Sequence, residues 1–445
     1  MTAATFTCDV AVGGDDATVF ARFFDVLART GVSGSPSFSF DGRRRGGTYA
    51  VAGRGAAWTT TSLSHPLHQR EAVTRAEAFL GAMTSSWSAR VRPVAFAAFP
   101  FDATCPTDST WGELGRGAVI VPEWSLARTG DGYELRRTVA EGSSVSLDVV
   151  HGDLRAVADA LGNGTSRTVP TASWRGPSGD APPARVDFET RVRRALLAMS
   201  DVDATFAKVV VARRRTERVD HVVDTAELVR RLANDRSGGV IFHVERDGAT
   251  FAGAAPEWLV RLGADLRVAT EAVAGTRPVA DRGELSGSAK DRVEHGLVVR
   301  GIVEALGPVA TAIERRGPSV REHGASAHLA TEIRAVANPG VRVLDLVHAL
   351  HPTAATSGFP RGTSAAWLRE NEALGRGLYA GPVGVFDGDG RGEFAVALRS
   401  FLTRGTEVSF FAGAGIVRGS SPSEEFDETT LKMRTATALF DHGPP

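Results

Sequence analysis

The chain has 445 residues, of which 42% are hydrophobic and 23% are charged, and its formal net charge is -1. These values predict a globular protein with a substantial core and argue against the strongly basic surface that binds nucleic acid. No stretch approaches the roughly 18 consecutive apolar residues of a membrane span. The N-terminus lacks the pattern of a signal peptide, and Cys8 and Cys105 form no CxxC pair, so we expect a cytoplasmic protein without disulfides.

Turn sequences flanked by β-prone segments recur along the chain and predict β-hairpins. They are Asp41-Gly42, Asp131-Gly132, Asp247-Gly248 and the run Asp387-Gly388-Asp389-Gly390. Apolar residues at helical spacing predict helices at about 187–199, 290–306 and 363–373. This mixture indicates an α+β fold with large antiparallel sheets rather than alternating βαβ units.

A segment rich in Gly, Pro, Ser and Thr divides the chain into two parts. We expect residues 163–184 to form a loop or linker between an N-terminal part, 1–162, and a C-terminal region, 185–445. The residues with candidate chemistry all lie in the C-terminal region.

Lysine is scarce in this chain. The 51 basic residues are 48 arginines and three lysines, Lys208, Lys290 and Lys432. A nucleotide bias toward arginine codons explains such scarcity. Lysine nevertheless differs chemically, because its pKa can fall on burial whereas arginine stays charged. The three lysines are therefore candidates for positions that arginine cannot fill.

Lys208 and Glu257 are candidates for a catalytic base and acid. Lys208 begins the apolar run Val209–Val211, which predicts a buried strand, and Glu257 follows a hairpin strand. A buried lysine and a separate glutamate would serve as base and acid. Each residue fits equally well as a charge at a strand end, and their spacing does not show whether they meet.

Glu294 lies on the apolar face of the predicted helix at 290–306, because it precedes Leu297 and Val298 by three and four residues. A charged residue on a buried face needs a partner. A magnesium ion shared with the C-terminal helix would supply one, and a buried arginine is the structural alternative.

Two predicted strands suggest contacts with an anion. Alternation along a strand ending at Arg399 places its guanidinium on the same face as Ala395 and Ala397, with space to grip a carboxylate. The next strand contains Gly413 and Gly415, which would let a ligand approach the backbone. A bulge or tight turn is the commoner reason for such glycines.

The C-terminal helix combines two carboxylates with a lysine. The segment Ser421–Glu424 supplies an N-cap residue, a proline at the first helical position and a capping-box glutamate. Helical spacing then places Glu425, Glu428 and Lys432 on one face, as a hard cation beside an anionic ligand would require. Taken alone, a solvated acidic first turn explains this segment more often.

Together, these segments resemble the chorismate-utilising enzymes and, among them, the isochorismate synthases. The segments stand in order as AKVVVAR (207–213), FAGAAPEWL (251–259), EAVAGTRPV (271–279), SGSAKDRVEH (286–295), LHPTAATSGFP (350–360), GRGLYAGPVG (375–384), GEFAVALRS (392–400), FFAGAGIV (410–417) and SSPSEEFDETTLKM (420–433). Nine ordered segments are far more specific than any one motif. The resemblance implies two large antiparallel sheets packed as a sandwich with helices on the outside.

The resemblance also implies site residues. Lys208 corresponds to a general base that activates water, and Glu257 to a general acid that protonates the hydroxyl leaving C4 of chorismate. The positions for Mg2+ are Glu294, Glu425 and Glu428. The substrate-binding positions are Gly275, Thr276, His351, Tyr379, Arg399, Gly413 and Lys432. A free lysine is a poor base at neutral pH, so burial or a cationic neighbour would have to lower the pKa of Lys208. Lys290 receives no role beyond a structural ion pair.

Lys208 also narrows the choice within the family. The relatives that use ammonia lack this lysine, so we expect water chemistry, no glutamine amidotransferase partner and a monomer. Salicylate synthases carry a threonine where this chain has Ala355, which favours an isochorismate synthase. Thr356 stands where a leucine or valine is expected, so salicylate synthase remains the alternative. A non-catalytic chorismate-binding homologue is the second alternative.

Overall fold

The computed structural model describes residues 3–12, 14, 16–29, 36–61, 63, 66–84, 92–104, 108–140, 145–163, 182–201, 203–233 and 237–440. Most of the predicted linker, 164–181, and Cys105 lie outside these residues. The helices of the described chain are α1 (Asp16–Arg29), α2 (Pro66–Ala82), α3 (Leu147–Asn163), α4 (Pro182–Ser200), α5 (Thr225–Ala233), α6 (Ala289–Leu306), α7 (Val343–Leu350), α8 (Arg361–Asn371) and α9 (Pro422–Thr437). The three helices predicted from periodicity are therefore confirmed as α4, α6 and α8. Among the described helices, none has the length and apolar character needed to cross a membrane.

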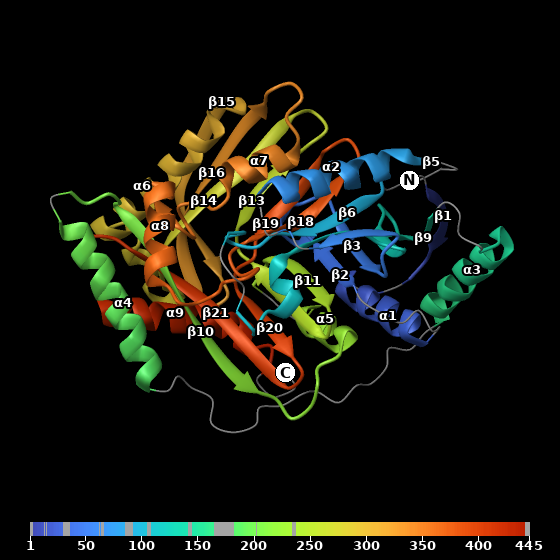
Figure 1. Cartoon of the computed structure of the whole chain (residues 1–445), viewed down its shortest axis with the longest axis horizontal. Helices are drawn as coiled ribbons and strands as arrows, with labels where there is room; N and C mark the ends of the chain where they lie inside the picture. The colour runs from blue at the N-terminus through green and yellow to red at the C-terminus, as the bar shows by residue number, and fades with distance from the viewer. Residues whose placement is uncertain are drawn as a thin grey trace.

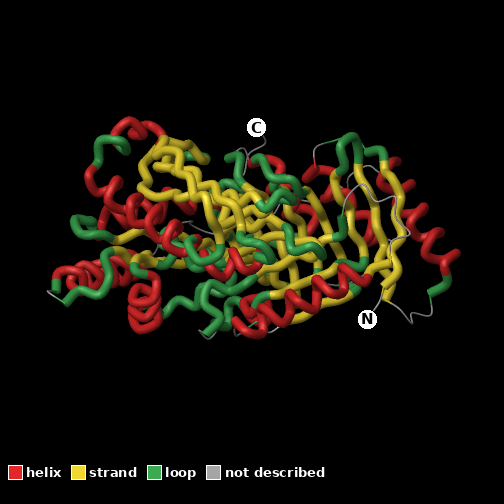
Figure 2. The backbone as a smooth tube through the Cα atoms, turned by 90° about the horizontal axis from the view of Figure 1, so that it is seen from above, coloured by secondary structure: helices red, strands yellow, loops and turns green. Residues whose placement is uncertain are grey.

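Two large sheets form the centre of the molecule (Figures 1 and 2). The first contains, in spatial order, β17 (Gly358–Phe359), β10 (Lys208–Arg218), β21 (Glu407–Ile416), β20 (Ser400–Arg404), β12 (Ala249–Ala255), β11 (Val240–Arg246), β2 (Ser37–Asp41), β3 (Ala50–Arg54), β8 (Trp124–Arg128), β9 (Tyr133–Ala140), β1 (Ala3–Val10) and β5 (Met83–Thr84). Its described strand pairs are antiparallel except for the short parallel contact between β1 and β5.

The second sheet contains β15 (Ala310–His323), β16 (Ser326–Ala337), β14 (Arg267–Pro278), β13 (Trp258–Leu262), β19 (Gly392–Val396), β18 (Pro382–Asp387), β6 (Val94–Ala98), β7 (Ala118–Val121) and β4 (Trp58–Thr61). The described strand pairs of this sheet are antiparallel. Strands from both halves of the sequence belong to each sheet, so the N-terminal part completes the fold instead of forming a separate sheet.

The four predicted hairpins are confirmed, and one shows why its sequence works. Asp247 and Gly248 join β11 to β12 with φ values of 52° and 72°. A two-residue turn with positive φ at both positions matches the right-handed twist of paired strands, and aspartate followed by glycine tolerates that conformation. The other turn sequences connect β2 to β3, β8 to β9 and β18 to β19.

Helices cover the outer faces of both sheets, and an aromatic core fills the space between them (Figure 2). This inner core joins Phe38 and Phe242 of the first sheet to Phe96 and Trp258 of the second. On the outer faces, α2, α6 and α7 pack on the second sheet, and α1, α3, α4, α5, α8 and α9 pack on the first. The predicted sandwich with outer helices is therefore confirmed.

The chain crosses between the two sheets at neighbouring points. β12 continues through Pro256 and Glu257 into β13, and β19 continues through Ala397–Arg399 into β20. These crossings are adjacent because β12 pairs with β20 in one sheet while β13 pairs with β19 in the other. Helices α4, α6, α8 and α9 gather at one end of the molecule (Figure 1).

Candidate active site

A cavity of about 70 Å³ lies at these crossings, and its lining residues all fall between 210 and 432. The lining includes eight of the predicted site residues: Glu257, Gly275, Thr276, Glu294, Tyr379, Arg399, Gly413 and Lys432. Lys208 is not among the lining residues, but its side chain contacts Glu294, which is. The tertiary fold thus gathers side chains from β14, α6, β21, α9 and both sheet crossings.

A larger neighbouring cavity of about 570 Å³ contains none of the three lysines and does not contain Glu257. It is lined instead by Phe101, His348 and His351, and it shares Arg376 with the smaller cavity. The Nε2 atom of His351 lies 3.0 Å from the carbonyl oxygen of Phe101. The structure therefore separates His351 from the other predicted site residues. The smaller cavity is the candidate active site because the charged residues Glu257, Arg399 and Lys432 line it.

Lys208 is completely buried at the start of β10, as its apolar sequence context predicted. Its Nζ lies 3.1 Å from Glu294 Oε1, although the angle does not make a good hydrogen bond. Gly415 leaves room for this pair, because a Cβ there would lie 2.0 Å from Glu294 Oε1 and 2.9 Å from Lys208 Cε. Among the described residues, the partner of Glu294 is therefore a lysine and not the arginine that the sequence offered as the structural alternative.

Glu257 is held in a state suited to donating a proton. Its side chain is 2% exposed, and Oε1 has no hydrogen-bond partner. Burial raises its pKa to about 8, and the negative charge of Glu271 adds to that effect, whereas the charges of Lys208 and Lys432 oppose it. A carboxyl group with this pKa is mostly protonated at neutral pH. Lys208 is near enough for its charge to act on Glu257.

Arg399 reaches the cavity by a route that differs from the predicted one. β19 ends at Val396, and Arg399 has a φ of 51°, so it belongs to a sheet crossing and not to a regular strand. The prediction from strand alternation was therefore wrong in its reason, although the side chain does enter the cavity. Only a small set of non-glycine residues adopts positive φ, and such positions cluster at functional sites.

The guanidinium of Arg399 is buried without a carboxylate partner. Its Nη2 donates to Ser326 Oγ at 3.0 Å and lies 3.0 Å from His328 Nε2, while Nη1 has no partner. Among the described residues no carboxylate is within ion-pair distance of it, and burial lowers its pKa to about 10. A buried cation with free donors fits the carboxylate of a ligand.

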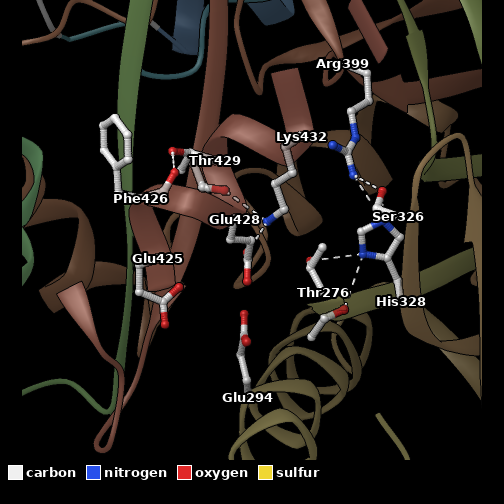
Figure 3. Close-up of polar contacts among 12 residues, drawn as sticks. Thr276, Glu294, Ser326, His328, Arg399, Glu425, Phe426, Glu428, Thr429 and Lys432 are labelled. Atoms are coloured by element: carbon white, nitrogen blue, oxygen red, sulfur yellow. Dashed lines mark hydrogen bonds and ion pairs between the residues drawn. The ribbon is translucent and has the colours of Figure 1, made fainter. Parts of the chain in front are cut away.

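His328 and Ser326 escaped the sequence analysis. His328 Nδ1 lies 3.0 Å from Thr276 Oγ1, and its Nε2 lies 3.1 Å from Ser326 Oγ (Figure 3). Burial and the positive charge of Arg399 hold the pKa of His328 well below its ordinary value, so the ring is neutral and accepts from Arg399. A histidine between the apolar residues Ala327 and Leu329 was the one available signal.

The three lysines of the chain each face one of the three predicted metal ligands. Lys208 pairs with Glu294 at 3.1 Å, Lys290 with Glu425 at 2.5 Å, and Lys432 with Glu428 at 2.6 Å. Lys432 also donates to the carbonyl oxygen of Gly413 at 3.0 Å. The carboxylates of Glu294 and Glu428 point toward one another, with Glu425 beside them (Figure 3).

The three glutamates are not arranged around a common point as the ligands of a metal ion are. Among the described residues, no cluster of three or more His, Cys, Asp or Glu side chains is arranged to hold a metal ion. The donor set nevertheless fits Mg2+, because carboxylate oxygens are its preferred protein ligands. Burial raises the pKa of Glu425 to about 7, and the negative charge of Glu428 adds to that effect.

The helices that carry these groups form largely as the sequence predicted. Glu294 lies on the buried face of α6, and Ser288 caps that helix by accepting from the Asp291 amide. In α9, Pro422 occupies the first turn as expected, but Ser421 makes no side-chain capping bond. The predicted capping box is therefore wrong, and the Ser421 hydroxyl contacts Ser423 instead.

Arg376 forms a further wall of the cavity that the sequence analysis missed. Its Nε and Nη2 bind both carboxylate oxygens of Glu372, at 2.5 and 2.8 Å. The remaining donors bind the carbonyl oxygens of Thr356 and Val210 at 2.8 and 2.7 Å. Arg376 thereby fixes Thr356, which lines the cavity, and all three of its side-chain nitrogens are engaged in these contacts.

The chain resembles known proteins across nearly its whole length. The family model described as chorismate binding enzyme matches residues 24–440. The salicylate biosynthesis isochorismate synthase of Pseudomonas aeruginosa is 32% identical over 348 residues, which cover 75% of this chain and 71% of the relative. The isochorismate synthase MenF of Bacillus subtilis is 31% identical over 356 residues, which cover 77% of this chain and 74% of the relative.

Solved structures share the fold. The menaquinone-specific isochorismate synthase MenF from Escherichia coli superposes with a TM-score of 0.76 at 22% identity, covering 99% of this chain and 95% of that one. Anthranilate synthase component I from Streptococcus pneumoniae superposes with a TM-score of 0.63 at 18% identity, covering 80% of this chain and 83% of that one. With the family model spanning both sheets and the whole candidate site, the chain belongs to the chorismate binding enzyme family.

Proposed function

We propose that the protein is an isochorismate synthase, which isomerises chorismate to isochorismate with Mg2+ as cofactor. The observation that carries this proposal is the pair Lys208 and Glu257. Both are buried: Glu257 lines the cavity, and Lys208 lies beside the lining residues Glu294 and Gly415. Glu257 holds its proton near neutral pH because burial raises its pKa to about 8. Relatives named isochorismate synthases add support.

The reaction needs a base and an acid at different ring carbons. Lys208, as the free amine, takes a proton from water as the water oxygen bonds to C2. The double bond shifts, the bond from C4 to its hydroxyl breaks, and Glu257 gives its proton to that oxygen, which leaves as water. One water enters and one leaves, so substrate and product are isomers. Positioned acid–base groups contribute about 10²–10⁴ each to the rate.

Other residues would hold the substrate's two carboxylates. Arg399 offers its unpartnered Nη1 from within the sheet crossing, and Lys432 lies across the same cavity. Tyr379 is buried, and its pKa is raised to about 12, so its hydroxyl remains a hydrogen-bond donor at working pH. Bound Mg2+, held by Glu294, Glu425 and Glu428, would neutralise the ring carboxylate.

The test is to incubate the purified protein with chorismate and Mg2+ and to separate the products by chromatography. Formation of isochorismate without salicylate supports the proposal. Absence of any conversion by a folded protein would contradict it and favour a chorismate-binding homologue without catalytic activity.

Thr356 supports a second candidate, a salicylate synthase that eliminates pyruvate from isochorismate. It lines the cavity, and its Oγ1 has only weak contacts with Thr353, at 3.4 Å to the carbonyl oxygen and 3.5 Å to the hydroxyl. Salicylate together with an equal amount of pyruvate in the same assay would favour this reaction.

Metal dependence and assembly form separate expectations. A chelator should abolish turnover and added Mg2+ should restore it, whereas activity that survives chelation would exclude the three glutamates as an essential metal site. We further expect a cytoplasmic monomer that needs no amidotransferase subunit, which light scattering and assay of the isolated chain would check.

A further inference from the structure

Lys290 has no part in the proposed reaction, yet its position is unusual. It is the second residue of α6, where a positive charge is unfavourable because the N-terminus of a helix is itself partly positive. Its Nζ lies 2.5 Å from Oε1 of Glu425, whose side chain is 1% exposed. A lysine that the helix dipole disfavours, and that pairs with a buried carboxylate, indicates that the site needs a positive charge at this position.

All three predicted metal ligands act on this ammonium group. Its Nζ contacts Glu425 directly, and the negative charges of Glu428 and Glu294 also attract it. Lys290 therefore lies in the combined negative field of the cluster. A monovalent cation at this place supplies part of the positive charge that a divalent ion would bring.

The three lysines differ in how freely they can leave their partners. Lys208 is enclosed, with 1% of its side chain exposed, and Lys432 is held by a second contact to Gly413. Lys290 has 26% of its side chain exposed, and among the described residues Glu425 is its one hydrogen-bond partner. Its ammonium can therefore turn into solvent without breaking another bond.

We propose that Lys290 is a placeholder cation, which neutralises Glu425 while the metal site is empty and turns out to solvent when a divalent cation binds. This inference rests on the proposed Mg2+ site. Without Lys290, the metal-free protein would bury an unpaired carboxylate beside two others, which is strongly destabilising. The cost is weaker metal binding, because the ion pair must break first.

The test is titration calorimetry of Mg2+ into the whole protein without chorismate, at pH 8.5. Lys290→Gln removes the competing cation, and we expect it to bind Mg2+ about tenfold more tightly than the wild type. Without metal, its melting temperature should be lower, and Mg2+ should raise it by more than it raises that of the wild type. Arg300→Gln is the matched control, because it breaks an exposed ion pair with Glu304 on the same helix and should change neither quantity.

Two outcomes separate the failure of this inference from the failure of the metal site. Equal or weaker Mg2+ binding by Lys290→Gln, with normal binding by the wild type, would overturn the placeholder role. Absence of Mg2+ binding by the wild type, with or without chorismate, would overturn the metal site as well. Should Lys290→Gln not fold, Lys290→Arg decides: a guanidinium pairs bidentately, so Mg2+ should bind more weakly, and tighter binding would contradict the proposal.

Discussion

Two groups of ion pairs lie in or beside the wall of the same cavity but differ in how completely their charges are satisfied. Arg376 binds Glu372 through two contacts and two carbonyl oxygens through its other nitrogens. The lysine pairs, from Lys208, Lys290 and Lys432, join their glutamates through single contacts. A guanidinium that is bound through all three of its nitrogens fixes the backbone around it, whereas an ammonium held by one contact, as that of Lys290 is, can exchange its partner. The first group therefore supports the cavity, and the second is available for chemistry and ligands.

The largest expected effect comes from Lys208→Ala. Loss of the base should lower kcat by about 10⁴, while substrate should still raise the melting temperature because the carboxylate-binding groups remain. Steady-state kinetics and thermal shift with chorismate measure both quantities. Unchanged turnover would show that Lys208 is not the base. The lysine pairs would then not differ from the Arg376 contacts in their availability for chemistry.

Arg376→Met should act on stability in the first place. It leaves the buried carboxylate of Glu372 without its cationic partner, although the Ala212 amide still donates to it. It also removes a donor from two carbonyl oxygens, so the free energy of unfolding should fall by about 3–5 kcal/mol. Urea denaturation measures this loss. The exposed pair of Arg300 and Glu304 provides the contrast, because Arg300→Met should cost at most about 1 kcal/mol. Similar losses in both variants would show that Arg376 is not a structural centre.

Glu257→Gln should make the protein more stable and less active. The folded protein binds the Glu257 proton more tightly than the unfolded chain, with a pKa of about 8 against 4.5 for an unperturbed glutamate. This contribution to stability is therefore lost as pH rises from 4.5 to 8. A glutamine escapes the loss, so the variant should be more stable by about 3 kcal/mol at pH 7 and by progressively less toward pH 4.5, while turnover falls sharply. Unfolding curves at several pH values would reveal a constant difference if the burial argument were wrong.

The same proton should limit the pH profile of the wild type. Above about pH 8, kcat/KM should fall as Glu257 ionises in the free enzyme. A profile that stays flat to pH 9.5 would assign the acid to another group.

The smallest effect is expected from Thr356→Val, which removes the one hydroxyl that raises the question of pyruvate elimination. Its contacts with Thr353 are long, so stability should change by less than about 1 kcal/mol. If the wild type releases any pyruvate, the variant should release less, as a lactate dehydrogenase-coupled assay would record. More pyruvate from the variant would contradict this reading of Thr356.

Local signals in the sequence account for much of the fold. Turn residues such as Asp247-Gly248 fix hairpins within a few positions, and the helical period places Glu294 on a buried face before any partner is known. The scarcity of lysine also indicated Lys208 and Lys432. These inferences succeed because each depends on residues that are close in the chain.

The rest depends on contacts between distant segments. Arg399 and Glu257 approach one another because two sheet crossings lie side by side, which no spacing in the sequence encodes. The positive φ of Arg399 and its contacts with Ser326 and His328 arise only when β16 lies beside that crossing. His351, which the motif suggested as a site residue, instead faces the neighbouring cavity.

The pairing of the three lysines with three glutamates also makes the protein unusually easy to probe. A reagent or protease specific for lysine meets its side-chain targets only at this cluster, since the chain contains no other lysine. In the native protein the side chain of Lys290 is the most exposed of the three, and that of Lys208 is buried. Acetylation read by mass spectrometry would therefore report, without any engineered label, how far the cluster opens as a metal or substrate binds.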